Sequence, residues 1–286
     1  MGETLVTSAI DGLLIGVIYG LAAMGLTLIF GVMDVINLAH GPIIALGMFG
    51  VYLLFTFLGL NPFIALAIVA VAGLLLGFVI YFIAVNRVID APPLSSLLST
   101  FSVNMMIIGV GTAVLSTSAY NVDYSLGTVQ LGFFRVPGTR LTASLVALLV
   151  TLLLYLFLYR TRPGKYIRAV ANNRMSAELM GIPSTRILAL AFGIGTMLAT
   201  ISGGLIATIL PINILAGGSF ELKSFVIVVL GGLGNPLGAM IGGLILGLIE
   251  GVVPVFMKTT WVPVIEYVLF VLILLVRPQG IMGAKE

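Results

Sequence analysis

The side chains that could do chemistry in this sequence gather in two stretches that interrupt apolar runs. In both, an apolar run ends, polar residues follow, and a proline begins the next apolar run. The residues concerned are Asn37, His40, Gly41 and Pro42 in the first stretch (31–47) and Gly234, Asn235 and Pro236 in the second (231–242). Gly-Pro and Asn-Pro break helices, and proline suits the first turn of a new one. Paired interruptions of this kind are typical of substrate paths in transporters.

The residue types needed for catalysis or metal binding are nearly absent. The chain has one histidine, His40, and no cysteine, so neither a metal cluster nor a cysteine nucleophile can be assembled. The segment PGKY (163–166) lacks the first glycine and the hydroxyl of a phosphate-binding loop. We therefore expect no enzymatic activity, no cofactor, no metal and no ATP binding by this chain.

The amino-acid composition indicates the class of fold that holds these residues in place. Of 286 residues, 60% are hydrophobic and only 8% are charged, and the mean hydropathy is +1.25. A soluble domain is about one quarter charged, so a soluble fold is excluded. We expect an all-α, polytopic membrane protein with about eight transmembrane helices, of which one or two are broken or re-entrant, forming one domain over residues 1–286.

Apolar stretches near the length needed to cross a bilayer, about 20 residues, mark the expected spans. They run over 11–32, 43–58, 63–85, 94–115, 141–159, 187–210, 237–256 and 262–276. A shorter apolar piece, 224–233, precedes the seventh span. The N-terminal stretch has no Lys or Arg before Arg87, so we interpret it as a retained span rather than a signal peptide.

Positive charge is concentrated in the segment 160–186. Its basic residues are Arg160, Arg162, Lys165, Arg168, Arg174 and Arg186, with Glu178 as the single acid. A basic loop between spans indicates the cytoplasmic side rather than nucleic-acid binding. Alternation then places the N-terminus and 116–140 outside and 86–93 inside. The C-terminus stays open, because Arg277 and Lys285 favour the inside while a count of eight spans puts it outside.

Several features allow two interpretations. The stretch 31–42 fits a broken helix or a short cytoplasmic turn about equally, whereas 231–238 favours a broken or re-entrant helix. Asn104, in the fourth span, either lines a path or bonds another helix. Glu250 and Glu266 also lie within or near spans. Glycines recur every four residues at Gly12, Gly16 and Gly20 and at Gly243, Gly247 and Gly251, a pattern that favours packing within the chain over contact with a partner chain.

Four motifs together resemble one family. The runs GLAAMGLTLIFGVMDVINLAHGPIIALG (20–47), GKYIRAVANNRMSAELMGI (164–182), VLGGLGNPLGAMIGG (229–243) and RPQG (277–280) occur in the order found in permease subunits of branched-chain amino acid ABC importers. The second run departs from the E-A-A form of many ABC permeases, of which Ala177, Glu178 and Gly181 keep the outline.

The resemblance implies an assembly as well as a fold. It implies an ABC importer permease in the bacterial inner membrane, surrounded by lipid and joined to a second permease, two cytoplasmic ATPases and an external solute-binding protein. Asn37, His40 to Pro42, Asn104 and Gly234 to Pro236 would form the path or its gates. Within the coupling loop 160–186, we expect Lys165, Arg168, Ala177, Glu178 and Gly181 to transmit the ATPase motion. The alternative is a gradient-driven secondary carrier or channel.

Overall fold

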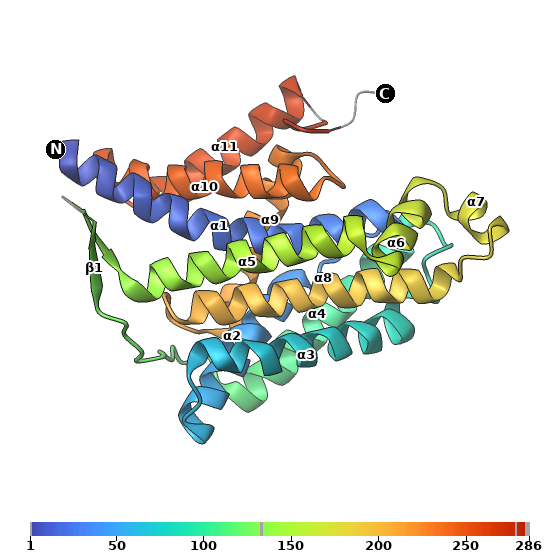
Figure 1. Ribbon diagram of the computed structural model, residues 1–286, viewed down its shortest axis with the longest axis horizontal. Helices are drawn as coiled ribbons and strands as arrows, with labels where there is room; N and C mark the ends of the chain where they lie inside the picture. The colour runs from blue at the N-terminus through green and yellow to red at the C-terminus, as the bar shows by residue number, and fades with distance from the viewer. Residues whose placement is uncertain (1, 132–133, 278, 284–286) are drawn as a thin grey trace.

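The computed structural model describes residues 2–131, 134–277 and 279–283, and within these ranges it is a bundle of long helices (Figure 1). The elements are α1 (Gly2–Met33), α2 (His40–Leu58), α3 (Pro62–Ile80), the π-helix η1 (Tyr81–Val85), α4 (Pro93–Leu115), β1 (Thr128–Leu131), β2 (Phe134–Pro137), α5 (Gly138–Arg160), α6 (Arg162–Asn172), α7 (Arg174–Leu179), α8 (Ser184–Ala207), the 3₁₀-helix η2 (Ile214–Ala216), α9 (Gly217–Gly231), α10 (Pro236–Phe256) and α11 (Trp261–Val276). The expectation of a helical membrane protein is confirmed, and the short antiparallel hairpin β1–β2 is its one sheet in the described ranges.

Eight helices in the described ranges are long and apolar enough to cross a membrane. Seven of them coincide with expected spans, namely α1, α2, α3 with η1, α4, α5, α8 and α10. The eighth is 214–231, which combines η2 and α9, whereas the sequence had indicated only a short piece over 224–233. The polar residues at the start of α9 hid half of this helix from the hydropathy pattern. The last expected span, 262–276, corresponds to α11, which is a shorter apolar helix.

The bundle has two ends that carry different segments (Figure 1). The β1 end holds the N-terminus and the hairpin, and the α6 end holds α6, α7 and the C-terminus. The C-terminal segment is fixed there because the Ile281 and Met282 amides donate to the carbonyl oxygens of Leu230 and Gly231, at 2.8 and 3.0 Å. The start of α1 and residues 279–283 therefore lie at opposite ends of the bundle.

Glycine contacts bring α1 and α10 together along their length. A Cβ on Gly16 would lie 2.6 Å from the carbonyl oxygen of Gly243, and Gly12 and Gly247 face each other in the same way. The two glycine faces recognised in the sequence thus pack on each other within the chain, as expected. Close backbone approach lets dispersion and weak hydrogen bonds hold helices where water provides no hydrophobic drive.

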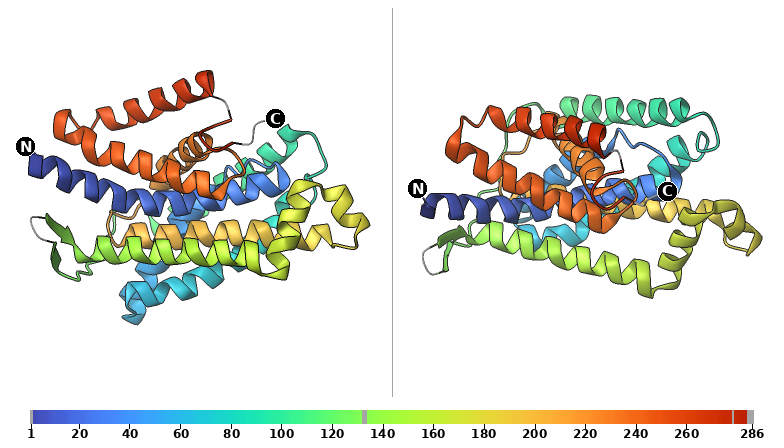
Figure 2. Two further views of the ribbon diagram at one scale, coloured as in Figure 1. Left: turned by 45° about the horizontal axis from the view of Figure 1, so that its top comes forward. Right: turned by 90° about the horizontal axis from the view of Figure 1, so that it is seen from above.

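The helix α8 forms the other half of the core and is the most deeply buried span. It packs on α1, α2 and α3, so the interior of the bundle is built around α1 and α8. By contrast, α4 buries 22% of its apolar span, the smallest share of the eight. Seen from above, α4 (blue-green) and α5 (yellow-green) lie at opposite edges of the molecule (Figure 2).

Local sequence explains where several helices begin. Asn61, Thr161, Asn173 and Asn235 each precede a helix, and their side-chain oxygens accept hydrogen bonds from backbone amides of the first turn. In three of these helices a proline follows the cap. This is the position where the missing amide of proline costs least.

We predict that Gly247→Ala destabilises the fold, because the added methyl group meets the backbone of Gly12 and Gly16. The expected cost is about 1–3 kcal/mol. The matched control is Gly109→Ala in α4, where a Cβ meets nothing within 4 Å. That change should leave stability unchanged or raise it by less than about 1 kcal/mol. Unfolding midpoints in mixed detergent micelles compare the two, and equal effects would contradict the packing role of Gly247.

Candidate functional site

Two helices begin in the interior of the bundle, and their first turns meet. After α1 ends at Met33, residues 34–39 fold back along α1, and α2 starts where His40 Nε2 lies 3.0 Å from the Ala22 carbonyl oxygen. Ala22 is 11 residues before the end of α1, which corresponds to about 16 Å along the helix axis. Because the hydrocarbon core is about 30 Å thick, α2 begins near its middle. The first stretch is therefore a broken segment rather than a surface turn.

The second interior start is that of α9. The chain leaves α8 at Ala207, turns back through 208–216 and begins α9 at Gly217. A Cβ on Gly217 would lie 2.8 Å from the Gly41 carbonyl oxygen, so the two helix starts touch through glycine backbone. No side chain caps α2, whereas η2, which runs directly into α9, is capped by Asn213, whose Oδ1 accepts from the Leu215 amide at 2.9 Å. The start of α2 and the first residues of α9 thus meet at one place, which we call the junction and define by 37–42, Asn104 and 217–221.

Asn37 and His40 are completely buried at the junction. The Asn37 side-chain oxygen accepts from the Ala39 amide at 3.1 Å, which holds the turn before α2. Because the Ala22 carbonyl can only accept, His40 carries its proton on Nε2. Within the described residues, Asn37 Nδ2 and His40 Nδ1 have no hydrogen-bond partner. Pro42 lies in the first turn of α2, where its missing amide leaves no helical bond unmade.

The helix α4 supplies the polar groups that satisfy the irregular backbone of 34–39. Thr100 Oγ1 donates to the Ile36 carbonyl at 2.9 Å and accepts from the Leu38 amide at 3.3 Å. Asn104 Nδ2 donates to the Leu38 carbonyl and to Glu221 Oε2, the latter at 3.1 Å. Asn104 therefore bonds another helix, which confirms one of its two interpretations; that it lines a path stays a prediction.

Glu221 of α9 is the junction residue that the sequence reading did not single out. It is 9% exposed and lies in the span 214–231. The run SFELKS (219–224) was a detectable signal, because a carboxylate directly between Phe220 and Leu222, in a mostly apolar segment, fits the inside of a helix bundle. It was missed because the apolar piece was taken to start after it.

A second buried polar cluster joins α1, α9, α10 and α11. Lys223 Nζ lies 2.9 Å from both carboxylate oxygens of Glu250 and 4.7 Å from the centre of the Tyr19 ring. Glu266, which is 1% exposed, lies in α11, and its Oε1 has no partner within the described residues. The sequence had pointed to Glu250 and Glu266 but not to the lysine that pairs with the former.

Gly234, Asn235 and Pro236 lie at the α6 end rather than at the junction. Asn235 caps α10 by accepting from the Leu237 and Gly238 amides, at 3.1 and 3.2 Å, and its amide nitrogen donates to the Met282 carbonyl at 3.0 Å. The stretch 231–236 is a turn between α9 and α10. The expected helix break at this point is therefore wrong, and the re-entrant element of this half is α9 itself.

A narrow groove of about 130 Å³ connects this turn to the basic loop. Its lining includes Gly31 of α1, Arg168 of α6, Gly234 and Pro236. Arg168 is fixed in place because its Nε donates to the Leu158 carbonyl at 3.1 Å and its guanidinium lies 4.5 Å from the centre of the Tyr159 ring. The end of α1, the turn and α6 thus form one contact region.

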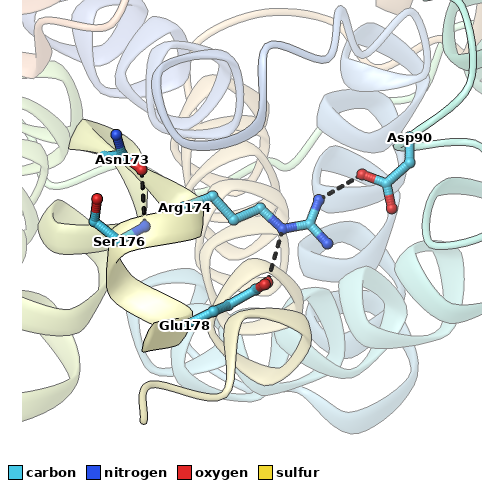
Figure 3. Close-up of polar contacts among 5 residues, drawn as sticks. All are labelled: Asp90, Asn173, Arg174, Ser176 and Glu178. Atoms are coloured by element: carbon cyan, nitrogen blue, oxygen red, sulfur yellow. Dashed lines mark hydrogen bonds and ion pairs between the residues drawn. The ribbon is translucent and has the colours of Figure 1, made fainter. Parts of the chain in front are cut away.

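The helices α6 and α7 make up the projecting part of the basic loop. Arg174 joins α7 to the loop after η1 through Asp90 at 2.7 Å, and it bonds Glu178 at 3.2 Å, while the Asn173 side-chain oxygen caps the helix by accepting from the Ser176 amide (Figure 3). Burial alone would lower the pKa of Arg174, but the hydrogen bonds and charges of Asp90 and Glu178 raise it above the ordinary value. Arg174 is therefore a permanent cation.

The end of α7 has a defined geometry. Gly181 has φ +81°, and its amide donates to Glu178 while the next amide, of Ile182, donates to the carbonyl of Ala177. This is a helix stop that glycine favours. Ala177 is buried against the rest of the loop, whereas Lys165 is exposed. Neighbouring apolar side chains point to solvent, with Met175, Leu179 and Met180 exposed to 76%, 83% and 82%.

No group of three or more His, Asp or Glu side chains that could hold a metal ion occurs in 2–131, 134–277 and 279–283. The junction is instead lined by neutral amides, one imidazole and one carboxylate. Such groups bind and orient a polar solute through hydrogen bonds.

Comparison with known proteins gives consistent relatives. A family model described as "Branched-chain amino acid transport system / permease component" matches residues 8–276. The high-affinity branched-chain amino acid transport system permease protein LivH of Salmonella typhimurium is 30% identical over 96% of this chain and 94% of its own length. BraD of Pseudomonas aeruginosa, described in the same terms, is 30% identical over 97% and 95%. The fructose import permease protein FruF of Bifidobacterium longum is 28% identical over 75% and 59%. No solved structure matches significantly.

The buried pair Lys223–Glu250 yields a stability prediction. Lys223→Met leaves Glu250 without its cation, and we expect a cost of about 2 kcal/mol. This is less than for a fully buried pair, because the two side chains are 18% and 27% exposed. Adding Glu250→Gln to Lys223→Met should recover part of the lost free energy of unfolding, because it removes the unpaired charge. Unfolding midpoints in mixed micelles measure each variant.

The control for this prediction is the exposed ion pair of Arg174 (Figure 3). Arg174→Met should cost less than about 1 kcal/mol, because solvent screens exposed charges. If Lys223→Met and Glu250→Gln have simply additive costs, the two side chains do not depend on each other and the interpretation fails.

Proposed function

Because this chain belongs to the family of permease components of branched-chain amino acid transport systems, we propose that it translocates branched-chain amino acids into the cell. The chain is a multi-pass membrane protein and the permease of an ABC importer, and it is not itself catalytic. The observation that carries the substrate class is the similarity to amino acid permeases over nearly the full length of both chains. The fructose permease is similar over a smaller part of each chain.

The orientation in the membrane follows from the charge distribution. Eight basic residues belong to segments at the α6 end, namely the loop after η1, the last turn of α5, α6, α7, the first turn of α8 and the residue after α11: Arg87, Arg160, Arg162, Lys165, Arg168, Arg174, Arg186 and Arg277. Three belong to segments at the β1 end, namely β2, the first turn of α5 and the turn between α10 and α11: Arg135, Arg140 and Lys258. Since cytoplasmic loops are enriched in Lys and Arg, the α6 end faces the cytoplasm and the β1 end faces outward. In this proposed orientation the start of α1 faces outward and residues 279–283 face the cytoplasm.

We propose that two cytoplasmic ATPases bind at the α6 end. Met175 and Leu179 are four residues apart on α7 and so share one side of the helix, and Met180 follows directly at its end. All three side chains are more than three quarters exposed. A helix that presents such anchors to a groove is a common way to bind a soluble partner.

The coupling residues of the loop 160–186 have distinct roles in this proposal. Arg168 and Ala177 hold α6 and α7 against the bundle, and Glu178 fixes α7 through Arg174. Gly181 allows the chain to turn sharply toward α8. Lys165 is exposed and free to meet an acidic surface. A push on α7 would reach the turn 234–236 through the groove that Arg168 shares with it.

The solute path in this proposal passes the junction. Asn37, His40, Gly41, Pro42 and Asn104 would line it midway through the membrane, and Gly234 to Pro236 would gate its cytoplasmic end. A second permease would complete the path, and an external binding protein would deliver the solute at the β1 end. The membrane lipid contacts the outer faces of α3, α4 and α5, which are largely apolar and exposed.

The experiment that tests this function starts with mild solubilisation and mass spectrometry of the co-purifying proteins. Co-purification of ATPases in stoichiometric amounts supports the proposal. Leucine uptake into proteoliposomes that requires ATP on the side of the membrane that the α6 end faces supports it as well. Transport by the chain alone that follows an ion gradient without ATP would favour the gradient-driven carrier or channel instead.

The turn at Gly181 gives a prediction about coupling. Gly181→Val puts a branched side chain at φ +81°, which costs about 1–3 kcal/mol locally, so we expect ATP-driven uptake to be lost while the binding protein keeps its affinity for solute. Gly181→Asn is the control, because asparagine tolerates this conformation, and it should retain most uptake. Normal uptake by Gly181→Val at normal membrane levels would refute the coupling role.

The exposed apolar residues give a second prediction. Replacing Met175, Leu179 and Met180 together by serine should reduce ATP-driven uptake by about tenfold or more, since truncating central anchors of an interface costs about 2 kcal/mol each. Folding should be unaffected, because these side chains are mostly solvent-exposed. Ser176→Ala on the same helix is the control. Co-purification of ATPases at wild-type stoichiometry with the triple variant would argue against this docking face.

A further inference from the structure

Glu221 is a buried carboxylate without a cation. The ion pairs in the described ranges join Arg140 to Asp11, Arg174 to Asp90 and Glu178, and Lys223 to Glu250, and Glu221 takes part in none of them. Its recorded partner is the neutral amide of Asn104. A carboxylate in the middle of a membrane protein is costly unless a cation or several donors meet it.

The orientation of the Asn104 amide leaves a second acceptor free. Its two neighbours, the Leu38 carbonyl and the Glu221 carboxylate, can only accept, so the amide nitrogen must face both. The amide oxygen, Oδ1, is then left without a donor within the described residues, although Asn104 is only 7% exposed. The carboxylate and this oxygen are neighbouring acceptors that both lack donors.

Unpartnered donors lie on the other side of the same segment. Asn37 Nδ2 is fully buried and has no acceptor in the described part of the chain. Asn37 is adjacent in sequence to Leu38, which bonds Asn104, so both residues belong to the irregular turn before α2. A buried donor without a partner is destabilising.

A zwitterion supplies what this arrangement lacks. An α-ammonium group offers three donors and a positive charge, and an α-carboxylate accepts hydrogen bonds from amides and helix starts. We propose that Glu221 and Asn104 bind the α-ammonium group of an amino acid in transit, while the unpartnered Asn37 Nδ2 binds its α-carboxylate. This inference rests on the proposed function and makes the permease itself selective for α-amino acids over solutes without an ammonium group.

The exposed side of α9 gives a solute access to the junction. Gly218, Ser219 and Leu222 are exposed beside Glu221, so one side of the α9 start is open. The helix α4, which carries Asn104, is the least buried of the candidate spans. Because Asn37 and His40 are fully buried, a solute reaches them only when α4 moves away from α9. That movement breaks the bond between Asn104 and Glu221 and frees both groups for the ammonium.

The absence of cysteine from the chain permits a direct test. Ser219→Cys places one thiol next to Glu221 in the assembled complex in proteoliposomes. The probes are two methanethiosulfonates of similar size, one with a trimethylammonium group and one with a sulfonate group. We expect the cationic probe to react about tenfold faster, because a nearby carboxylate attracts it and repels the other. Leucine should protect the thiol, and 4-methylpentanoate, which lacks the ammonium group, should not.

Glu221→Gln in the same background should remove most of the preference between the two probes. It should also lower ATP-driven leucine uptake by about tenfold or more, the size expected when a charged hydrogen bond is lost. Glu266→Gln is the control, because Glu266 is equally buried and lies outside the junction. It should leave both readouts near those of the parent. A Leu75→Cys variant on the exposed face of α3 should not react with either probe.

The outcomes separate this inference from the proposed function. Suppose that the parent complex shows ATP-driven leucine uptake, and that Glu221→Gln changes neither this uptake, nor the probe preference, nor the protection by leucine. The ammonium site is then refuted, while the importer function stands. If the parent complex shows no ATP-driven uptake of any amino acid, the proposed function fails and the site falls with it. Equal protection by leucine and 4-methylpentanoate would likewise refute an ammonium site.

Discussion

The structure depends on one constraint, which is that every backbone amide and carbonyl at membrane depth needs a partner inside the protein. Residues 34–39 violate helical geometry in the interior of the bundle, and Thr100 and Asn104 supply the bonds that the helix no longer makes. Ala22 does the same for His40. This explains why a helix as loosely packed as α4 carries polar residues on its inner side. The irregular segment 34–39 and the polar side of α4 therefore depend on each other.

The glycine contacts serve the same constraint in a different way. Where α1 meets α10 and where α2 meets α9, backbones approach so closely that no Cβ fits at Gly16 or Gly217. Such contacts bring helix starts and helix faces together without adding polar groups that would need partners of their own. The rigid pair α1–α10 then supports one side of the junction, while α4 closes the other side with a smaller contact.

Much of the fold could be predicted from the sequence, because membrane spans are long, apolar and bounded by prolines and charges. The broken start of α2 was visible as a polar patch followed by Gly41-Pro42. The start of α9 was not, because Glu221 and Lys223 lower the hydropathy of a helix whose polar side is buried. For the same reason 231–236 was taken for a break when it is a turn. Hydropathy reports composition, whereas the depth of a residue depends on which helices surround it.

The positions of the two termini have a consequence for how such chains can be joined. The N-terminus lies at the β1 end and the residues up to 283 lie at the α6 end, held by backbone bonds to the last turn of α9. A linker from residue 283 of one copy to residue 2 of an equally oriented second copy would therefore have to run from the α6 end to the β1 end. In the proposed orientation such a linker would need a further crossing of about 20 apolar residues.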